Sequence, residues 1–542
     1  MHRFTLLQGR RFTPKDMFIV LKLFTPIHQL QNLNSLLGDQ DNDNTIGHNS
    51  YIRFKRDSNM DSLKKGKKEM KKKPREIIAT FKPLFNPRSV ALIGVSANSK
   101  KMGYHVLRSF LKSGFKGEVY PVNPSYEELF ELKVYPSLDS IPDEVDLVVI
   151  AVPQKAVFDV MEDCVRKGVK AAVVISAGFR EAEIREGEEH HRRLAEIANK
   201  GNIKIIGPNT FGMVNLNANL NASFTPALSL IKKGKIALVS QSGGVCHVIM
   251  PYAIKEGIGF SKIVGLGNRV NTDFHNMLEY LLHDDETKSI ALYVEGIDEP
   301  RKLMLAAREV TPYKPIVAYK AGRFQKANKA AKSHTGSLAG KYELYIAAFK
   351  QAGVIIAEDS VELVSIAKAL AYQPPAKGDR VAVISLVAGL GMISADVCEL
   401  KGLKLTDFTE ETQKKLMELL PPYTIRTNPV DLGYVANDRE LCGEVIKTVF
   451  GDENVDALVV NYIYSWSEDF LQLPVRQIIE GHKESGKPVT MCLNFPPGFW
   501  DEEKEILEEN GIPTFPTPEL SAKALAGLVE YGKIKRKFSE LL

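Results

Sequence analysis

Short runs of apolar and β-branched residues recur along the chain from residue 89 onward, separated by segments with helical periodicity. The first five runs are SVALIGV, GEVYPVN, VDLVVIAV, KAAVVISAG and IKIIGPN. A second block holds GKIALVS, FSKIVGLG, SIALYVEG, KPIVAYKAG and GVIIAED, and a third holds DRVAVISL, LKLTDF, VDALVVNYIY, KPVTMCLNF and GIPTFPT. Uninterrupted apolar strands are typical of parallel sheets that helices cover on both faces. The pattern predicts an α/β protein with three consecutive doubly wound parallel-sheet domains.

Prolines mark one domain boundary clearly, in the linker-like stretch AYQPPAKGD at 371–379. The boundary between the first and second blocks, near NASFTPALSLIKKGK, is less sharp. We expect domains over residues 76–222, 223–372 and 373–542, preceded by an extension over residues 1–75.

The N-terminal extension contains the polar stretch GDQDNDNTIGHNS and the charged run KKGKKEMKKKPRE, and neither has the composition of a folded segment. Two interpretations remain open. Either the extension is disordered, or a start codon has been placed upstream of the true one, because Met60 and Met70 lie close before the first domain.

Composition and charge narrow the class of protein. Hydrophobic residues make up 44% of the 542 residues, and no run approaches the roughly 18 uninterrupted apolar residues of a membrane span. Residues 1–69 contain 12 Lys or Arg and 7 Asp or Glu, a surplus of +5 that equals the whole formal charge, so the remaining chain is neutral. We therefore expect neither a membrane nor a nucleic-acid partner. The five scattered cysteines form no C-x-x-C pair, which argues against a disulfide framework or a metal site and favours the cytoplasm.

The turn after the first strand, in IGVSANSKKMGYHVLRSF, has features of a phosphate-binding site. Gly94 follows the strand, Gly103 opens the next helix, and Lys100 and Lys101 supply positive charge. This is not a G-x-G-x-x-G motif, and glycines that merely serve packing remain an alternative. A nicotinamide-dinucleotide domain commonly has an acidic residue after its second strand, whereas Asn123 stands here. The site would therefore accept a nucleotide whose ribose is already phosphorylated, such as coenzyme A.

The second block opens with ALVSQSGGVCHVIMPYAI, in which a strand ends at Ser240 and a helix begins. Backbone amides at Ser242, Gly243, Gly244 and Val245 could bind an anion, although the same residues also suit an ordinary tight turn. Cys246 and His247 lie inside the helix, and we expect them to be packed rather than catalytic.

One histidine stands among small residues in AAKSHTGSLAGKYELY, between a predicted strand and a predicted helix. His334 could cap the helix, or it could take part in chemistry. Glu295 follows the strand in ALYVEGI, where its carboxylate could orient the imidazole or simply be exposed.

The chain resembles the alpha subunit of ADP-forming acyl-CoA synthetases, relatives of succinyl-CoA synthetase. The resemblance covers about residues 85 to 535 and rests on the separated motifs VVISAGF, GPNTFG, SQSGGV, YVEGI and SHTGSLAG. It implies a Rossmann-like CoA-binding domain followed by two flavodoxin-like ligase domains. It also implies an acid–thiol ligase of the ADP-forming acetate–CoA ligase type, which interconverts acyl-CoA, ADP and phosphate with acid, CoA and ATP.

The resemblance also implies roles for individual residues. His334 matches the histidine that is phosphorylated, Glu295 its acidic partner, and Ser242 to Val245 the helix terminus that holds phosphate. Asn209 matches a position near the acyl group. The coenzyme A site would be formed by Gly94, Ser96, Lys100, Lys101, Gly103, Asn123, Pro153, Ser176 and Gly178.

Partners follow from the same resemblance. No ATP-grasp segment follows the third block, so we expect Mg-ADP or Mg-ATP on a separate ATP-grasp beta subunit, in a heterotetramer of two alpha and two beta subunits. The third domain reads SLVAGLGMISAD where relatives commonly have a glycine-rich turn, although NPVDL at 428–432 is retained. That departure motivates an alternative function, a catalytically inactive CoA-binding sensor or scaffold of the same fold. A nicotinamide-dependent dehydrogenase is disfavoured by Asn123.

Overall fold

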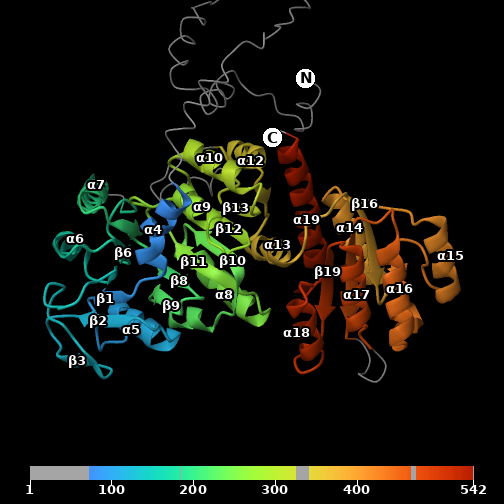
Figure 1. Ribbon diagram of the computed structural model, residues 1–542, viewed down its shortest axis with the longest axis horizontal. Coiled ribbons are helices and arrows are strands. Elements are labelled where there is room, and N and C mark those ends of the chain that lie inside the picture. The colour runs from blue at the N-terminus through green and yellow to red at the C-terminus, as the bar shows by residue number, and fades with distance from the viewer. Residues whose placement is uncertain (1–72, 183–184, 325–340, 465–471, 541–542) are drawn as a thin grey trace, which may run out of the picture.

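The chain folds into three α/β domains that lie side by side, with the first at the left and the third at the right of Figure 1. The computed structural model describes residues 73–182, 185–324, 341–464 and 472–540. All fifteen strands predicted from the apolar runs are present. Each contains buried residues except the short edge strand β16 (Lys404–Leu405), in which Lys404 is exposed and Leu405 half-buried.

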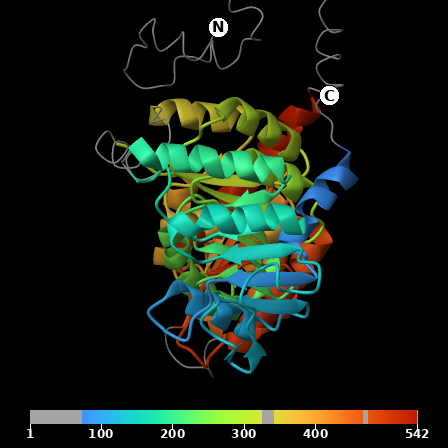
Figure 2. The same cartoon turned by 90° about the vertical axis from the view of Figure 1, so that its left-hand side faces the viewer.

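The first sheet has the strand order β2-β1-β5-β6-β7, and all of these neighbours pair in parallel. Helices α6 and α7 lie along its outer face in Figure 2. Strands β3 and β4 of this domain pair antiparallel with each other and form a separate two-stranded sheet. The strands are β1 (Ser89–Ile93), β2 (Glu118–Val122), β3 (Glu128–Leu129), β4 (Leu132–Lys133), β5 (Leu147–Ile150), β6 (Ala171–Val174) and β7 (Lys204–Ile206); the helices are α4 (Pro74–Phe85), α5 (Met102–Ser113), α6 (Gln154–Lys167) and α7 (Arg185–Lys200).

The second sheet has the order β14-β13-β12-β10-β11-β8-β9. Its β8–β9 hairpin, which the apolar pattern did not predict, pairs antiparallel with β11. The change from the first to the second sheet therefore lies between β7 and β8, ahead of the expected boundary at 222/223. The strands are β8 (Gly212–Asn215), β9 (Leu220–Ser223), β10 (Lys233–Ser240), β11 (Phe260–Gly265), β12 (Ser289–Val294), β13 (Ile316–Lys320) and β14 (Ile355–Ile356); the helices are η2 (Pro226–Leu230), α8 (Gly243–Lys255), α9 (Phe274–Leu282), α10 (Pro300–Val310), α12 (Tyr342–Gln351) and α13 (Ser360–Tyr372).

The third sheet has the order β16-β15-β18-β19-β20, with β17 paired to the end of β15. The strands are β15 (Arg380–Ser385), β16 (Lys404–Leu405), β17 (Val430–Asp431), β18 (Ala457–Ile463), β19 (Val489–Asn494) and β20 (Thr514–Phe515); the helices are α14 (Ala388–Leu400), α15 (Glu410–Leu419), η3 (Gly433–Asn437), α16 (Arg439–Gly451), α17 (Val475–Ser485), α18 (Asp501–Glu509) and α19 (Pro518–Ser539).

Helices α13 and α19 lie between the second and third domains and join their cores. The packing is close, because a Cβ at Gly527 of α19 would lie 2.5 Å from Cγ2 of Ile366 on α13. The buried Lys368 adds an ion pair to Glu508 on α18, with Nζ 2.6 Å from Oε1. Both contacts connect the second domain to the third.

All three sheets share one topology. Numbered along the chain within each domain, and leaving out the short β17, the parallel strands run in the order 2-1-3-4-5, with the switch point between the first and third strands. Ligands of doubly wound sheets bind beyond the carboxyl ends of the strands at this point. Ligand binding is therefore expected at the turns after β1, β10 and β15.

The described residues form neither a membrane span nor a cluster of metal ligands. Within these ranges, no helix is long and apolar enough to cross a membrane, and no three His, Cys, Asp or Glu residues gather as metal ligands would. All five cysteines are buried and free.

Candidate functional site

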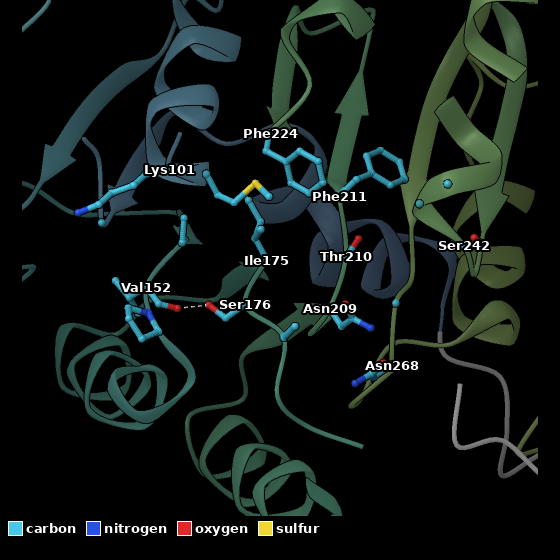
Figure 3. Close-up of a pocket in the computed structure, with 18 of the residues that line it drawn as sticks. Lys101, Val152, Ile175, Ser176, Asn209, Thr210, Phe211, Phe224, Ser242 and Asn268 are labelled. Atoms are coloured by element: carbon cyan, nitrogen blue, oxygen red, sulfur yellow. Dashed lines mark hydrogen bonds between the residues drawn. The ribbon is translucent and has the colours of Figure 1, made fainter. Parts of the chain in front are cut away.

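A cavity of about 810 Å³ lies between the first and second domains, where the turns after β1 and β10 face each other. Figure 3 shows it extending from Lys101 on one side to Ser242 on the other. Its lining residues are Gly94, Ser96, Lys101, Met102, Asn123, Ala151, Val152, Pro153, Ile175, Ser176, Ala177, Asn209, Thr210, Phe211, Phe224, Gln241, Ser242, Gly243, Gly244, His247, Gly267 and Asn268.

The turn after β1 brings the backbone close to the floor of the cavity. Gly94 has φ +89°, and a Cβ there would lie 2.7 Å from the Ala151 carbonyl oxygen, so only glycine fits. Asn123 holds this turn in place, because its Nδ2 donates to the Val95 carbonyl at 2.7 Å. The Asn123 side chain is thus used to position backbone.

The strand ends of β5 and β6 form the next part of the wall. The Ser176 hydroxyl donates to the Val152 carbonyl at 2.5 Å, as the dashed line in Figure 3 shows. The Asn209 backbone N–H donates to the Ser176 carbonyl at 2.9 Å, and Asn209 has φ +56°, which asparagine tolerates better than most residues. These hydrogen bonds connect the part of the cavity wall in the first domain to the segment that leads into the second domain.

Helix α8 points its N-terminus into the cavity. Ser242 is the N-cap residue, and its hydroxyl does not bond to the helix, while Gly243 and Gly244 line the cavity. Among the described residues, a Cβ at Gly244 would have only the Ser242 hydroxyl oxygen nearby, at 3.8 Å, so their packing does not require glycine there. The first amides of a helix have no intrahelical acceptor and carry partial positive charge, so this end of the cavity suits an anion.

Aromatic side chains stand beside this helix terminus. Phe211 and Phe224 line the cavity, and the His247 ring stacks on Phe224 with the ring centroids 6.2 Å apart. His247 Nδ1 donates to the Gly243 carbonyl at 2.8 Å, and the Thr225 hydroxyl lies 2.8 Å from Nε2. His247 is therefore packed, as expected, and it also faces the cavity. Cys246 is buried, as expected for a packed residue, and burial raises the pKa of its thiol to about 12.

Charge is unevenly distributed along the cavity. Lys101 is the one lysine, arginine, aspartate or glutamate among the described residues that line it. The end formed by α8, Phe211 and Phe224 therefore offers backbone amides and apolar surface. An anionic ligand with a long uncharged portion matches this gradient.

Glu295 stands outside the cavity wall, on the turn after β12, and neighbouring side chains hold its backbone. Gln241 Oε1 accepts hydrogen bonds from the N–H groups of Glu295 and Gly296 at 2.9 and 3.0 Å. From the other side, Lys320 Nζ donates to the Glu295 carbonyl at 2.9 Å. Burial lowers the pKa of Lys320 to about 8, and the nearby charge of Glu295 partly opposes that shift.

The structure brings most of the predicted site residues together. Lining the cavity are Gly94, Ser96, Lys101, Asn123, Pro153, Ser176, Asn209, Ser242, Gly243 and Gly244. Not among the lining residues are Lys100, Gly103, Gly178, Val245 and Glu295. Gly103 packs so closely under the turn after β1 that a Cβ would lie 1.9 Å from the Gly94 carbonyl oxygen. His334 lies outside the described residues, with Thr335, Gly336 and Ser337.

Sequence reasoning missed several wall residues. Gln241, Thr210 and Asn268 are polar residues in turns that follow strands or lead into them, so position relative to the strand ends could have suggested them. Phe211 and Phe224 carried no such signal, because a phenylalanine beside a sheet is more often part of a core.

Two family profiles match the chain. Residues 88–215 match the CoA binding domain, and residues 233–370 match the succinyl-CoA ligase like flavodoxin domain. The fold and the cavity thus define a CoA-binding α/β protein of the acyl-CoA ligase class.

Named relatives narrow the class further. The chain is 43% identical over 453 residues to the alpha subunit of ADP-forming acetate–CoA ligase II of Pyrococcus furiosus, covering 83% of this chain and 97% of that protein. It is 39% identical to the isoenzyme I alpha subunit of the same organism, covering 85% and 100%. A solved structure of the dinucleotide-forming acetyl-coenzyme A synthetase 1 of Ca. Korarchaeum cryptofilum, in complex with phosphate and ADP, is similar with a TM-score of 0.76 at 34% identity, covering 85% and 99%. The chain belongs to the family of ADP-forming acetate–CoA ligase alpha subunits.

Proposed function

We propose that the chain is the alpha subunit of an ADP-forming acyl-CoA ligase that works through an acyl phosphate and a phosphohistidine on His334. The observation that carries the proposal is the single cavity that joins the predicted CoA residues, Asn209 and the N-terminus of α8. Coenzyme A would place its phosphates toward Lys101 and its thioester toward Asn209, with inorganic phosphate at Ser242, Gly243 and Gly244.

The chemistry then proceeds in two transfers at this site, and a third passes the phosphoryl group from the imidazole to ADP. A phosphate oxygen attacks the thioester carbonyl carbon, the carbon–sulfur bond breaks, and the CoA thiolate leaves and takes up a proton. An imidazole nitrogen of His334 next attacks the phosphorus of the acyl phosphate, and the carboxylate leaves as the phosphorus–oxygen bond to it breaks. The α8 amides would stabilise phosphate charge in both steps. Glu295 would orient the neutral imidazole, fix its tautomer and stabilise the positive charge that the ring acquires on phosphorylation.

A partner subunit completes the proposal. The two Pyrococcus furiosus relatives are named as alpha subunits, which supports a second subunit for this chain. We place Mg-ADP or Mg-ATP on an ATP-grasp beta subunit and propose a heterotetramer of two alpha and two beta subunits. Co-purification followed by light scattering measures that stoichiometry.

The direct test is co-expression with the beta subunit and an assay of CoA-dependent ATP formation from ADP and phosphate, across short and aryl acyl-CoAs. Labelled phosphate should appear on His334 as an acid-labile, base-stable adduct, and ADP should discharge it only when the beta subunit is present. In His334→Ala, ATP formation should be abolished while acyl phosphate still forms in part. Label on a serine would contradict the mechanism. CoA binding without any ATP formation would favour the sensor or scaffold instead.

Two adjacent lysines offer a matched test of the CoA site. Lys101 lines the cavity and Lys100 does not. Lys101→Ala should therefore reduce the preference for CoA over dephospho-CoA, by up to about 1.5 to 3 kcal/mol for a well-formed charge-assisted contact. Lys100→Ala should leave that preference unchanged. Calorimetry with both nucleotides measures the difference, and equal effects of the two substitutions would contradict the assignment.

A further inference from the structure

One carboxylate joins the first and second domains beside the cavity. Asp298 accepts two hydrogen bonds from Arg180 of the first domain, at 2.8 Å from Nη1 and 3.0 Å from Nη2. It also accepts from Nη2 of Arg269 at 2.6 Å. The side chains of Arg180, Asp298 and Arg269 are 17%, 25% and 1% exposed, so this bridge is largely removed from solvent. Burial opposes ionisation of Asp298, but the two arginines outweigh it and lower its pKa.

Each member of the bridge lies next to a functional segment. Arg180 follows Ser176 and Ala177, which line the cavity, and Arg269 directly follows the lining residues Gly267 and Asn268. Asp298 stands three residues after Glu295 on the same turn.

Arg269 ties the bridge directly to the Glu295 turn. Its Nη1 donates to the Gly296 carbonyl at 2.9 Å, and its Nε lies 3.3 Å from Oδ1 of Asp273. Its φ of +59° is a backbone conformation that side-chain-bearing residues rarely adopt, so the surrounding contacts hold it there.

A second bridge crosses the same boundary in the opposite direction. The Glu181 carboxylate of the first domain accepts a hydrogen bond from Nδ2 of Asn268, which lines the cavity. The same carboxylate accepts from the Gly178 backbone N–H at 2.6 Å and from the Phe179 N–H at 3.2 Å. Two neighbouring carboxylates, one from each domain, thus fix the cavity loop of the first domain against the turns of the second.

We propose that Asp298 is a positioning residue that couples the CoA-side loop at 176–181 to the turn carrying Glu295. The inference rests on the proposed function, in which Glu295 serves phosphoryl transfer. Because the loop and the turn share one connected set of buried charge-assisted bonds, a shift of either one must displace the other or break a bond. Within the part of the chain that the structure describes, the hydrogen bonds of the Asp298 carboxylate go to Arg180 and Arg269, and it acts through the backbone of the Glu295 turn, which Arg269 holds at Gly296.

The test uses the full chain co-expressed with the ATP-grasp subunit. Acetyl-CoA and labelled inorganic phosphate are supplied, and the rate of label transfer to the chain is measured. Asp298→Asn should slow labelling about tenfold, since small misplacement of a catalytic group has large kinetic effects. In a Glu295→Gln background, Asp298→Asn should add less than about twofold, because a residue that acts through Glu295 has nothing left to position.

A matched control comes from the third domain. Asp456 is held there by Arg380 in a similar two-pronged contact, with Nε and Nη2 each 3.0 Å from a carboxylate oxygen. Asp456→Asn removes a comparable ion pair far from the cavity, so it should leave the labelling rate unchanged. If Asp298→Asn does not fold, Arg180→Gln removes the same inter-domain contact and carries the test.

The outcomes separate the two levels of the argument. A wild-type chain that takes no label overturns the proposed function, and this inference with it. A labelled wild type with Asp298→Asn at the same rate overturns the inference alone. Effects of Asp298→Asn and Glu295→Gln that multiply would show a merely structural role and would also overturn it.

Discussion

In the second and third sheets, the first of the five parallel strands along the chain, β10 or β15, ends in a buried serine, Ser240 in one and Ser385 in the other. Each hydroxyl donates to the carbonyl two residues later, at 2.7 Å in both turns. The next backbone N–H bonds to the third strand of its sheet in both cases, Gln241 to Tyr293 and Leu386 to Asn461. Both turns then enter a helix, α8 or α14.

The side chains on these matching backbones differ. Gln241 reaches across to hold the Glu295 turn, whereas Leu386 is buried in the hydrophobic core of the third domain. Ser242, Gly243 and Gly244 line the cavity, and none of the residues 386–389 does so. The fold therefore supplies a helix terminus at both switch points, and the side chains around it decide whether that terminus becomes a site.

The largest expected effect comes from the second residue of each helix. Of the residues that the structure describes, a Cβ at Gly244 would approach only the Ser242 hydroxyl oxygen, at 3.8 Å, and a Cβ at Gly389 of α14 would have none within 4 Å. Gly244→Val should reduce CoA-dependent ATP formation about 10²-fold by obstructing the anion site, with little change in thermal midpoint. Gly389→Val should change neither quantity. An equal loss of activity in both variants would mean that α14 also serves the reaction in this chain.

The next largest effect is expected from exchanging the two residues that follow these serines, Gln241 and Leu386. Gln241→Leu removes the acceptor for two backbone N–H groups, so it should cost about 1 to 3 kcal/mol of unfolding free energy and reduce turnover. Leu386→Gln buries an amide in an apolar core and should cost a similar free energy while folded protein keeps its turnover. Urea unfolding and ATP formation per folded molecule distinguish the two. Unchanged turnover in Gln241→Leu would argue against a role of this side chain in positioning Glu295.

The smallest effect is expected in the pH dependence of stability, to which Asp298 and Asp431 contribute in opposite directions. Arg180 and Arg269 lower the pKa of Asp298 below its ordinary 3.8 against the effect of burial, whereas burial raises the pKa of Asp431 in the third domain. Ionised Asp298 therefore stabilises the fold above pH 3.8, and this contribution is lost as the pH falls through the folded-state pKa. For Asp431 the effect on stability has the opposite sign. Burial favours its protonated form in the folded state, and the stability that this form contributes is lost as the pH rises from 3.8 through the raised pKa.

Replacing each aspartate by asparagine tests the direction of its contribution to stability. Asp298→Asn should be less stable than wild type at neutral pH, and the difference should shrink on acidification. Asp431→Asn should gain stability at neutral pH and lose that gain toward pH 3.8. Urea unfolding between pH 3 and 7 measures both differences, and a pH-independent difference for either variant would contradict the corresponding assignment.

The strands were predictable because of how parallel sheets are buried. Helices cover both faces, so every position of β5 or β6 is apolar and the run is visible without alignment. The turns after β1 and β10 were predictable for a related reason, since ligands of such sheets bind beyond the strand ends. Glycines there were ambiguous. Gly244 faces the cavity and Gly103 is required by packing, and both read as glycine near a helix start.

The β8–β9 hairpin was not predictable from its apolar pattern, because its buried positions include polar residues. Asn215 and Asn221 are fully buried. Asn215 Nδ2 donates to the Phe85 carbonyl at 2.9 Å, across 130 residues of sequence, and Asn221 Nδ2 donates to the Ser229 hydroxyl at 2.9 Å. A buried amide is stable only with such partners, and the partner of Asn215 is distant in sequence.

By itself, then, the sequence determined the three-domain α/β plan and the positions of the strand ends, because apolar periodicity and turn residues act locally. Tertiary structure alone decided which strand ends meet. Arg180 and Asp298 are 118 residues apart, and neither belongs to a local pattern that points to the other. Their contact exists because the two sheets place the turns after their strands face to face. A charge buried at that junction is stable only with a counter-charge, and Asp298 has one from each domain, Arg180 from the first and Arg269 from its own.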